Sequence, residues 1–211
     1  MVIKIKQEKN FTLKGVKMGL LDSGGGNSNY LVYKHGDKNF WLGKDDICEF
    51  DKLVVDVDSV KTGWGIYAED RYQFVWGEKP GILGPKPADI GDEYWRKAFS
   101  VDCYIKDTEE SVLWQSMTVG NCMAFNALTD TYLDRIEEKK PGQVGAFISL
   151  KDDKKRLKVA YKDEKKNTSW PLFEFHSWID RPEGFVSVTA AAEQREDTAD
   201  TSSVNESDIP F

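Results

Sequence analysis

Most of the chain consists of short segments in which apolar and polar residues alternate, and turn-forming residues separate these segments. An alternation with a period of two places the apolar side chains on one face of a β-strand. The pattern is clearest over residues 99–105, where Phe99, Val101, Cys103 and Ile105 occupy every second position. It predicts a mainly β protein in which each strand buries one face.

The same reasoning predicts a series of strands and one helix. The strands are expected at residues 2–6, 11–18, 30–33, 39–42, 53–60, 64–67, 72–76, 99–105, 112–117, 144–150, 156–161 and 172–179. Turn residues at 35–37 and 68–70 predict hairpins, and charged residues 151–154 are expected to join two strands. An apolar stripe predicts a helix over residues 118–139, which Pro141 and Gly142 end.

Residues 77–93 contain three prolines and four glycines, which predicts a long loop. Many short strands with a single helix are typical of a small closed or partly closed barrel. We therefore expect an OB-fold-like small barrel with one helix and a long Pro/Gly loop.

The acidic residues are concentrated at the C-terminus. The chain has 211 residues and a formal charge of −7, and residues 193–211 carry six acidic residues and one basic residue. That segment has few large apolar side chains, so it cannot bury enough surface to offset the entropy lost on ordering. We predict one domain over residues 1–189 and a disordered acidic tail over residues 190–211.

Charge, hydropathy and cysteine content exclude several classes of protein. A net negative charge excludes a uniformly basic nucleic-acid binder but permits a locally basic groove. No run of about 18 apolar residues exists, and residues 1–10 lack the apolar stretch of a secretory signal. Cys48, Cys103 and Cys122 are odd in number and widely spaced, so we expect reduced core residues in a cytoplasmic protein, with no membrane contact.

The sequence offers little support for an enzyme, a metal or a cofactor. Residues 23–29 are rich in glycine, but a predicted strand follows them instead of the Lys-Ser/Thr and helix that a phosphate-binding loop needs. The acidic pairs 45–46 and 152–153 have no spacing typical of a metal site. His35 and His176 lie in no catalytic motif. We therefore predict a protein without catalytic residues.

Residues 61–97 combine aromatic rings with basic side chains. Flat rings that stack on bases and cations that follow phosphates are what single-stranded nucleic-acid binding requires. Glycines beside the rings would let a strand of nucleic acid approach the backbone. The predicted nucleic-acid-binding residues are Lys61, Trp64, Tyr67, Arg71, Tyr72, Trp76, Lys79, Trp95 and Arg96.

Two features of this prediction stay open. Tyr72, Phe74 and Trp76 share one strand face, and that face could instead be the interior of the barrel. A second basic strip over residues 154–166 could extend the binding groove or could be a solvated hairpin.

The chain ends in Asp208, Ile209, Pro210 and Phe211 after the acidic segment. This ending resembles the C-terminal tail of bacterial single-stranded DNA-binding proteins, whose tails typically end in Asp-Asp-Ile-Pro-Phe; here Ser207 stands in place of the first aspartate. The resemblance implies an OB-fold domain that binds single-stranded DNA and a tip that recruits replication, recombination and repair proteins. It is confined to the tail, and the longer, different residues 1–189 favour a divergent, bacteriophage member.

The sequence thus predicts single-stranded DNA and tail-reading replication or recombination proteins as partners, and leaves a homo-oligomer open. An RNA-binding or cold-shock-like module, a metal-dependent nuclease and an adaptor that uses only its tail remain as alternatives.

Overall fold

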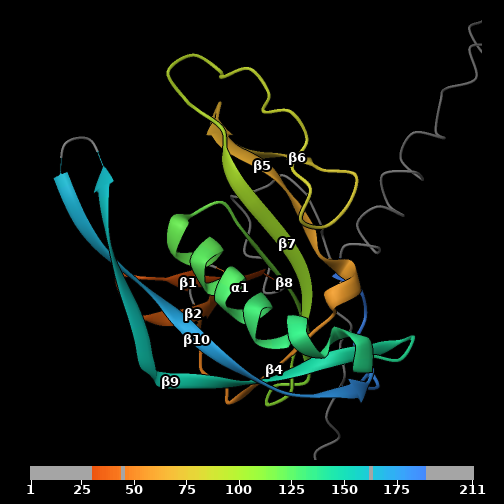
Figure 1. The fold of residues 1–211 in the computed structure, drawn as a ribbon. Coiled ribbons are helices and arrows are strands. Elements are labelled where there is room, and N and C mark those ends of the chain that lie inside the picture. Colours follow the sequence, from red (N-terminus) through yellow and green to blue (C-terminus); the bar gives the residue numbers. More distant parts are fainter. Residues whose placement is uncertain (1–29, 44–45, 162–163, 189–211) are drawn as a thin grey trace, which may run out of the picture.

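Figure 1 shows a computed structural model of the chain, which describes residues 30–43, 46–161 and 164–188, with the side chains of residues 151–168 excepted. The predicted strands 2–6 and 11–18, the glycine-rich segment 23–29 and the tail 190–211 with its tip lie outside the described residues.

The described chain folds into a mainly β structure with one α-helix, as predicted. The strands are β1 (Tyr30–Lys34), β2 (Asn39–Leu42), β3 (Asp46–Cys48), β4 (Lys52–Val55), β5 (Lys61–Ala68), β6 (Arg71–Trp76), β7 (Arg96–Ile105), β8 (Glu110–Ser116), β9 (Gln143–Tyr161) and β10 (Glu164–Asp180). The helical elements are η1 (Val57–Ser59), α1 (Val119–Tyr132) and η2 (Leu133–Glu138). None of the described helices is both long enough and apolar enough to cross a bilayer.

All ten strands belong to one mixed sheet. Its main order is β10-β9-β4-β7-β8-β1-β2-β3, and the hairpin β5–β6 joins it through β5 on β7. The pair β1–β8 is parallel and the other pairs are antiparallel. Strands β10 and β3 end the order without pairing with each other, so the described sheet does not close into a barrel.

The main core lies on one face of β7. Phe99, Val101, Cys103 and Ile105 are buried there, as the alternation predicted. Helix α1 covers this face, because the ring of Phe125 stacks on Phe99 with centroids 4.3 Å apart and planes 4° apart. The prediction that cysteines are core residues is confirmed at Cys48 and Cys103, and Cys122 is partly buried against the same cluster.

The predicted hairpins form at both positions. Glu69 and Asp70 have φ of 54° and 60°, the conformation of a two-residue turn that matches strand twist.

Three predicted boundaries were wrong. The strand predicted to reach residue 60 ends at Val55, because Asp56 caps the short η1 by accepting a hydrogen bond from the backbone of Asp58. The predicted helix is α only to Tyr132 and continues as η2. Residues 151–154 are not a hairpin turn, since they belong to β9, where the register with β10 passes from Leu150–Leu172 to Lys155–Trp170 and leaves them as an irregularity opposite Pro171.

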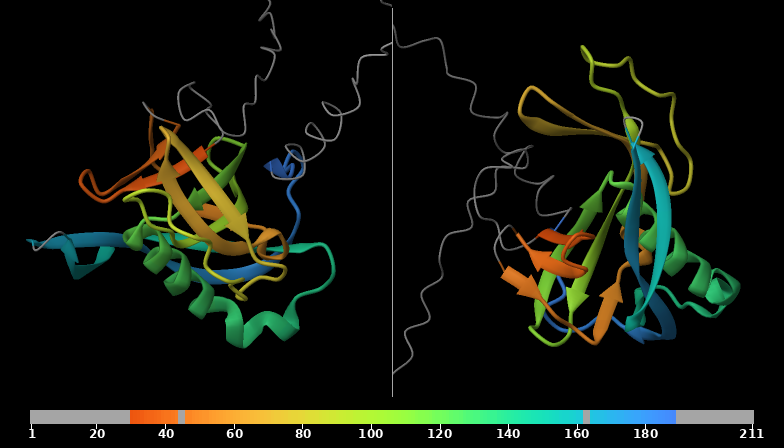
Figure 2. Two further views of the ribbon diagram at one scale, coloured as in Figure 1. Left: turned by 90° about the horizontal axis from the view of Figure 1, so that it is seen from above. Right: turned by 90° about the vertical axis from the view of Figure 1, so that its left-hand side faces the viewer.

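Two hairpins project from the body of the sheet in Figure 1: β9–β10, and β5–β6 with the loop that follows it. Figure 2 shows the same projections from two other directions.

Candidate nucleic-acid interface

Hairpin β5–β6 places four aromatic side chains on one face. Tyr67 pairs with Tyr72, and Phe74 and Trp76 follow at alternate positions of β6. Directly opposed residues and residues two apart share a face of the sheet, so all four belong to the same side. We call Tyr67, Tyr72, Phe74 and Trp76 the aromatic row.

The rings of the aromatic row contact one another in sequence. Tyr67 and Tyr72 have centroids 4.9 Å apart, Tyr72 and Phe74 are 6.5 Å apart, and Phe74 and Trp76 are 5.2 Å apart with planes 4° from parallel. Tyr67 and Tyr72 are 43% and 45% exposed, and Phe74 and Trp76 are partly buried. None of the four belongs to a core cluster of the described residues, so within that part of the chain the face they share is not part of a buried core.

Two glycines of β5 lie opposite residues of the aromatic row. Gly63 is opposite Trp76 and Gly65 is opposite Phe74. A Cβ on Gly65 would lie 2.9 Å from Cε1 of Phe74, and one on Gly63 would meet the backbone of the partner strand. The expectation that these glycines admit nucleic acid is wrong, because the chain's own ring and backbone take that space. Gly65 instead lets the ring of Phe74 lie flat against the sheet.

The basic side chains divide between the two faces. Arg96 is opposite Gly65 and Lys61 shares its face with Gly63, so both lie on the side of the aromatic row. The guanidinium of Arg96 lies 4.7 Å from the ring of Tyr94 and donates to its hydroxyl at 3.1 Å. Lys79 is exposed in the loop after β6.

Arg71 lies on the opposite face. It pairs with Ala68, one position along from the pair Tyr67–Tyr72, so its side chain points to the other face. There it forms an exposed 3.2 Å ion pair with Glu69. Of the predicted cations on this hairpin and on β7, the structure therefore groups Lys61 and Arg96 with the rings, but not Arg71.

Trp64 and Trp95 hold the long loop in place. The indole of Trp64 donates to the carbonyl of Gly84 at 2.9 Å, and that of Trp95 donates to Ala88 at 2.8 Å. Trp95 is only 7% exposed and packs on Ile66. These two tryptophans lie on the face opposite the aromatic row, so the structure does not bring them together with the other predicted rings, and Trp95 has no ring face open for stacking.

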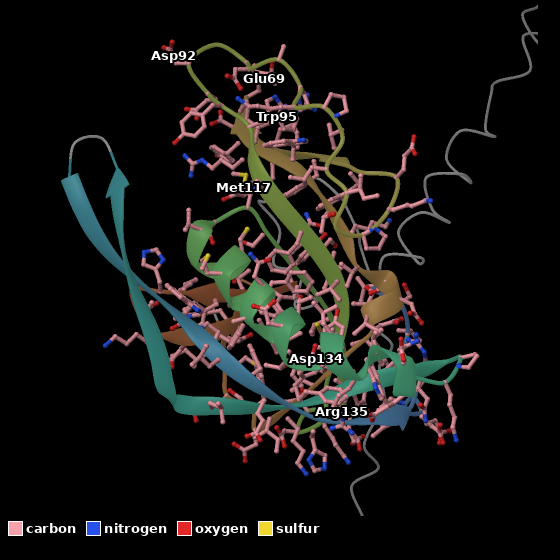
Figure 3. All side chains as sticks on the ribbon, viewed as in Figure 1. Glu69, Asp92, Trp95, Met117, Asp134 and Arg135 are labelled. Atoms are coloured by element: carbon pink, nitrogen blue, oxygen red, sulfur yellow. The ribbon has the colours of Figure 1, made fainter. Side chains whose placement is uncertain are left out.

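Figure 3 shows Trp95 and Glu69 at the end of the molecule that carries the loop, with Met117 closer to α1. Met117 was not predicted as a site residue. Its Cβ lies 3.1 Å from the position of a Cβ on Gly65, which places it beside Phe74. Phe74 and Tyr94 were in the predicted window but not among the chosen site residues, although the alternation of Phe74 with Tyr72 and Trp76 could have identified it.

The hairpin β9–β10 carries the second basic strip. Residues 151–166 contain eight Lys or Arg and four Asp or Glu. The register pairs Arg156 with Ser169 and Lys158 with Asn167, along the part of the hairpin that projects from the body (Figure 1). The basic strip is therefore part of a long two-stranded projection.

The segment that leads toward the tail is fixed to β7. The hydroxyl of Ser187 and the backbone N–H of Val188 donate to the buried carboxylate of Asp102, at 2.5 and 3.1 Å. Arg181 forms an ion pair with Asp56. Asp102 shares its sheet face with Arg96, so Ser187 and Val188, the last described residues, contact β7 on the face that carries the aromatic row.

The described residues contain no group of three or more His, Cys, Asp or Glu placed to hold a metal ion. Burial is the main cause that raises the pKa of both the Cys48 and the Cys122 thiols to about 11. These cysteines are therefore protonated near neutral pH and are poor nucleophiles.

No family model, no curated protein and no solved structure matches this chain.

Proposed function

We propose that the protein coats single-stranded DNA with little sequence preference. The observation that carries this proposal is the aromatic row, in which partly exposed rings follow one another along a projecting hairpin beside Arg96 and Lys61. Bases stack on such rings whatever their sequence, and the adjacent cations meet the phosphates. A duplex hides the faces of its bases, so this surface favours unpaired strands.

We also propose that the sheet is an open relative of the OB-fold. Strand β4 pairs with β7 and β9, β7 pairs with β8, and β9 pairs with β10. In an OB-fold, the loop between the first and second strands and the loop between the fourth and fifth contribute to oligonucleotide binding. With β4, β7, β8, β9 and β10 as the five strands, hairpin β5–β6 lies in the first of these connections and the tip of β9–β10 in the second. The two projections in Figure 1 thus correspond to the two binding loops.

The tail supports a second part of the proposal. Asp208, Ile209, Pro210 and Phe211 would recruit replication, recombination and repair proteins, with Phe211 in an apolar pocket and its carboxylate on a basic residue of the partner. Pro210 lowers the entropy lost on docking. Deletion of residues 208–211 should abolish capture of tail-reading proteins and leave DNA affinity unchanged. Loss of DNA binding in this truncation would contradict the proposal that the tip binds partner proteins while the rest of the chain binds DNA.

Two substitutions on one strand test the DNA-binding surface. Tyr72 and Val75 are both 45% exposed on β6, but they lie on opposite faces. Tyr72→Ala should weaken oligo-dT binding by about 1–3 kcal/mol, the typical value for one stacked base, and Val75→Ala should leave it unchanged. Fluorescence anisotropy of a labelled oligonucleotide measures both. Equal effects, or none, would show that the aromatic row does not carry the binding.

A further inference from the structure

Hairpin β5–β6 leaves one edge of β6 without a neighbouring strand. Within the described chain, β3, β6 and β10 each pair with a single strand. The backbone N–H and C=O groups along such an edge can pair with a strand of another chain, so proteins usually protect their edges. Figure 1 and Figure 2 show that β6 belongs to a hairpin that projects from the body of the sheet.

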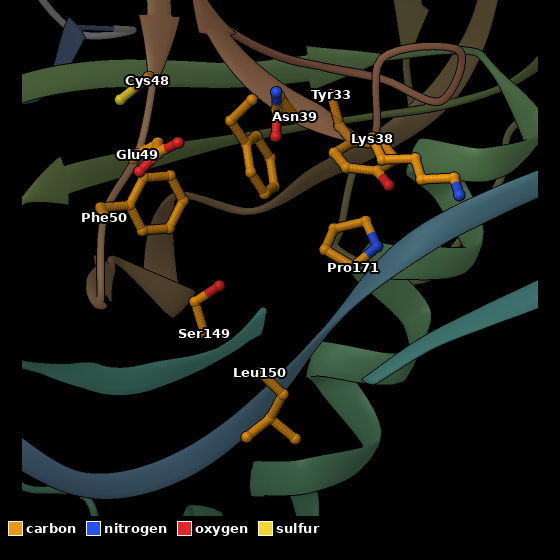
Figure 4. Close-up of a pocket in the computed structure, with 10 residues that line it drawn as sticks. Tyr33, Lys38, Asn39, Cys48, Glu49, Phe50, Ser149, Leu150 and Pro171 are labelled. Carbon is orange, nitrogen blue, oxygen red and sulfur yellow. The ribbon is translucent and has the colours of Figure 1, made fainter. Parts of the chain in front are cut away.

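Strands β3 and β10 carry features that keep an edge from pairing. Strand β3 is only three residues long. Strand β10 contains Pro171, which has no N–H to donate, and its register on β9 shifts there and again between Phe175 and Ser177. Pro171 also lines the same pocket as Cys48 of β3 (Figure 4), so these two end strands approach each other there. Neither edge is therefore suited to extend the sheet.

Strand β6 has none of these features. Its six residues, Arg71–Trp76, include no proline and no lysine. Its register on β5 is continuous from Ala68–Arg71 to Gly63–Trp76, so no bulge bends the strand. Each of its residues is at least partly exposed, and most are of the aromatic and β-branched types that favour strands. Of the three edges, that of β6 is the best suited to pair with another strand.

The turn of the hairpin determines which backbone groups point to this edge. A two-residue turn is closed by two residues that exchange hydrogen bonds, here Ala68 and Arg71, and such pairs alternate along the hairpin. The N–H of Gly77, which donates to the carbonyl of Thr62 at 2.8 Å, fits this alternation. The residues between these pairs direct their N–H and C=O groups away from β5; they are Tyr72, Phe74 and Trp76.

We propose that β6 pairs with β6 of a second copy of this chain, antiparallel and about a two-fold axis at Phe74. In this register Phe74 lies opposite the partner's Phe74, and Tyr72 lies opposite the partner's Trp76. All the outward-pointing backbone groups then exchange hydrogen bonds. Arg71 lies opposite the partner's Gly77, so no like charges meet. A second copy is the fitting occupant because the same unprotected edge is complementary to itself about this axis.

The pairing joins the aromatic rows of the two copies. A two-fold axis perpendicular to the sheet keeps Tyr72, Phe74 and Trp76 of both copies on one face. The second copy therefore completes a larger stacking surface, on which one DNA strand contacts rings of both copies. This consequence deepens the proposed function and rests on it, whereas the strand pairing itself does not.

Amide hydrogen exchange tests what covers the edge. The amides of Gln73 and Val75 donate to β5 and should exchange slowly at every protein concentration. Those of Tyr72, Phe74 and Trp76 should become protected as the concentration rises and the mass measured by ultracentrifugation doubles. A dimer without this protection, a monomer at every concentration, or protection in a particle of monomer mass would overturn the proposal. The last result would mean that another segment of the same chain covers the edge.

Paired substitutions on the face opposite the aromatic row test the register. In the proposed dimer, Gln73 lies opposite the partner's Val75, twice about the axis. Gln73→Lys with Val75→Lys places like charges there, whereas Gln73→Glu with Val75→Lys places opposite charges there. The first variant should have a dimer dissociation constant about tenfold higher than the second. Neither removes a ring, and equal dissociation constants would overturn the proposed pairing.

Oligo-dT binding separates this inference from the proposed function. An oligo-dT that reaches both aromatic rows should bind the variant with opposite charges about tenfold more tightly than the variant with like charges, and one that reaches a single row should not distinguish them. If the dimer forms but Tyr72→Ala leaves DNA binding unchanged, the proposed function is wrong and the strand pairing stands. If both variants and the wild type are monomers that bind DNA, the strand pairing is wrong and the proposed function stands.

Discussion

At the scale of single residues, the aromatic row depends on what lies beneath each ring. Phe74 covers Gly65, so its ring is held against the sheet, and Trp76 stacks on Phe74 at 5.2 Å. A ring that is already ordered loses little entropy when a base stacks on its outer face.

Gly65→Ala should disturb this arrangement. Its Cβ would lie 2.9 Å from Cε1 of Phe74 and 3.1 Å from Cβ of Met117, so the ring must move. We expect a loss of about 1–3 kcal/mol in the free energy of unfolding, as for other overpacked sites, together with weaker DNA binding. Thermal unfolding and anisotropy measure the two effects. Gly36→Ala is the control, since nothing lies within 4 Å of its added Cβ; equal effects of both changes would contradict this account.

The buried thiols predict a pH dependence. Cys48 and Cys122 have pKa values of about 11 in the folded protein against about 9 for a free thiol, because burial disfavours the thiolate. The unfolded state therefore loses these protons first as the pH rises. The stability that they contribute is fully present below pH 9 and is lost as the pH rises through 11.

Thiol modification measures the same property. Reaction of the native protein with iodoacetamide should accelerate between pH 9 and 11 and should be slow at pH 8. A rate at pH 8 equal to that of the denatured protein would show that these thiols are not protected.

Single residues also show which parts of the candidate site the sequence cannot predict. Tyr67, Tyr72 and Trp76 could be selected from their alternation and their basic neighbours. Trp64 and Trp95 could not be separated from them, because only the path of loop 77–95 shows that it covers the other face and accepts their indole hydrogen bonds.

At the scale of elements, strand β7 contributes to the main core, to the face that carries the aromatic row and to the contacts of the segment before the tail. One of its faces supports the main core under α1, and the other carries Arg96 at one end and Asp102 further along. Asp102 is fully buried and accepts hydrogen bonds from Ser187 and Val188. The segment before the tail is therefore fixed to the same strand that supports the aromatic row.

Asp102→Ala should release this segment. It removes the acceptor for the Ser187 hydroxyl and the Val188 N–H, and we expect a loss of about 1–3 kcal/mol in the free energy of unfolding. Hydrogen exchange at residues 186–188 should become faster, while exchange in β8 stays slow. Asp180→Ala, at the end of β10, is the control, because its hydrogen bond to Gln143 is exposed and 3.5 Å long. Unchanged exchange at residues 186–188 would mean that other contacts hold the segment.

The strands whose apolar residues alternate were predictable, and the long hairpin was not. Strand β7 packs one face on α1 and shows clear alternation, whereas β9 passes through Lys151, Asp152, Asp153 and Lys154 without an apolar position. In the sequence, such a run of charged residues predicts a turn between two strands. In the structure, it belongs to β9 as an irregularity opposite Pro171, between the pairs Leu150–Leu172 and Lys155–Trp170.

At the scale of the whole molecule, most of the net negative charge lies in the tail. The tail has a net charge of −5 by residue count, and Val188, the last described residue before it, contacts β7 on the face that carries the aromatic row. We expect it to compete with DNA for the cations there. Deletion of residues 193–211 should raise or preserve oligo-dT affinity, more clearly at low salt, where electrostatic repulsion is least screened. A clear loss of affinity in the truncated protein would contradict this competition.

A salt titration of oligo-dT binding, followed by tryptophan fluorescence, tests the central claim most directly. We predict quenching on binding and an affinity that falls with salt by a slope of about −0.7 per contacted phosphate. Arg96→Ala should make the slope shallower by about 0.7 if Arg96 contacts one phosphate, and Arg71→Ala, on the other face, should not change it. Absence of quenching, or a slope that responds to Arg71 and not to Arg96, would contradict the assignment of DNA binding to this face.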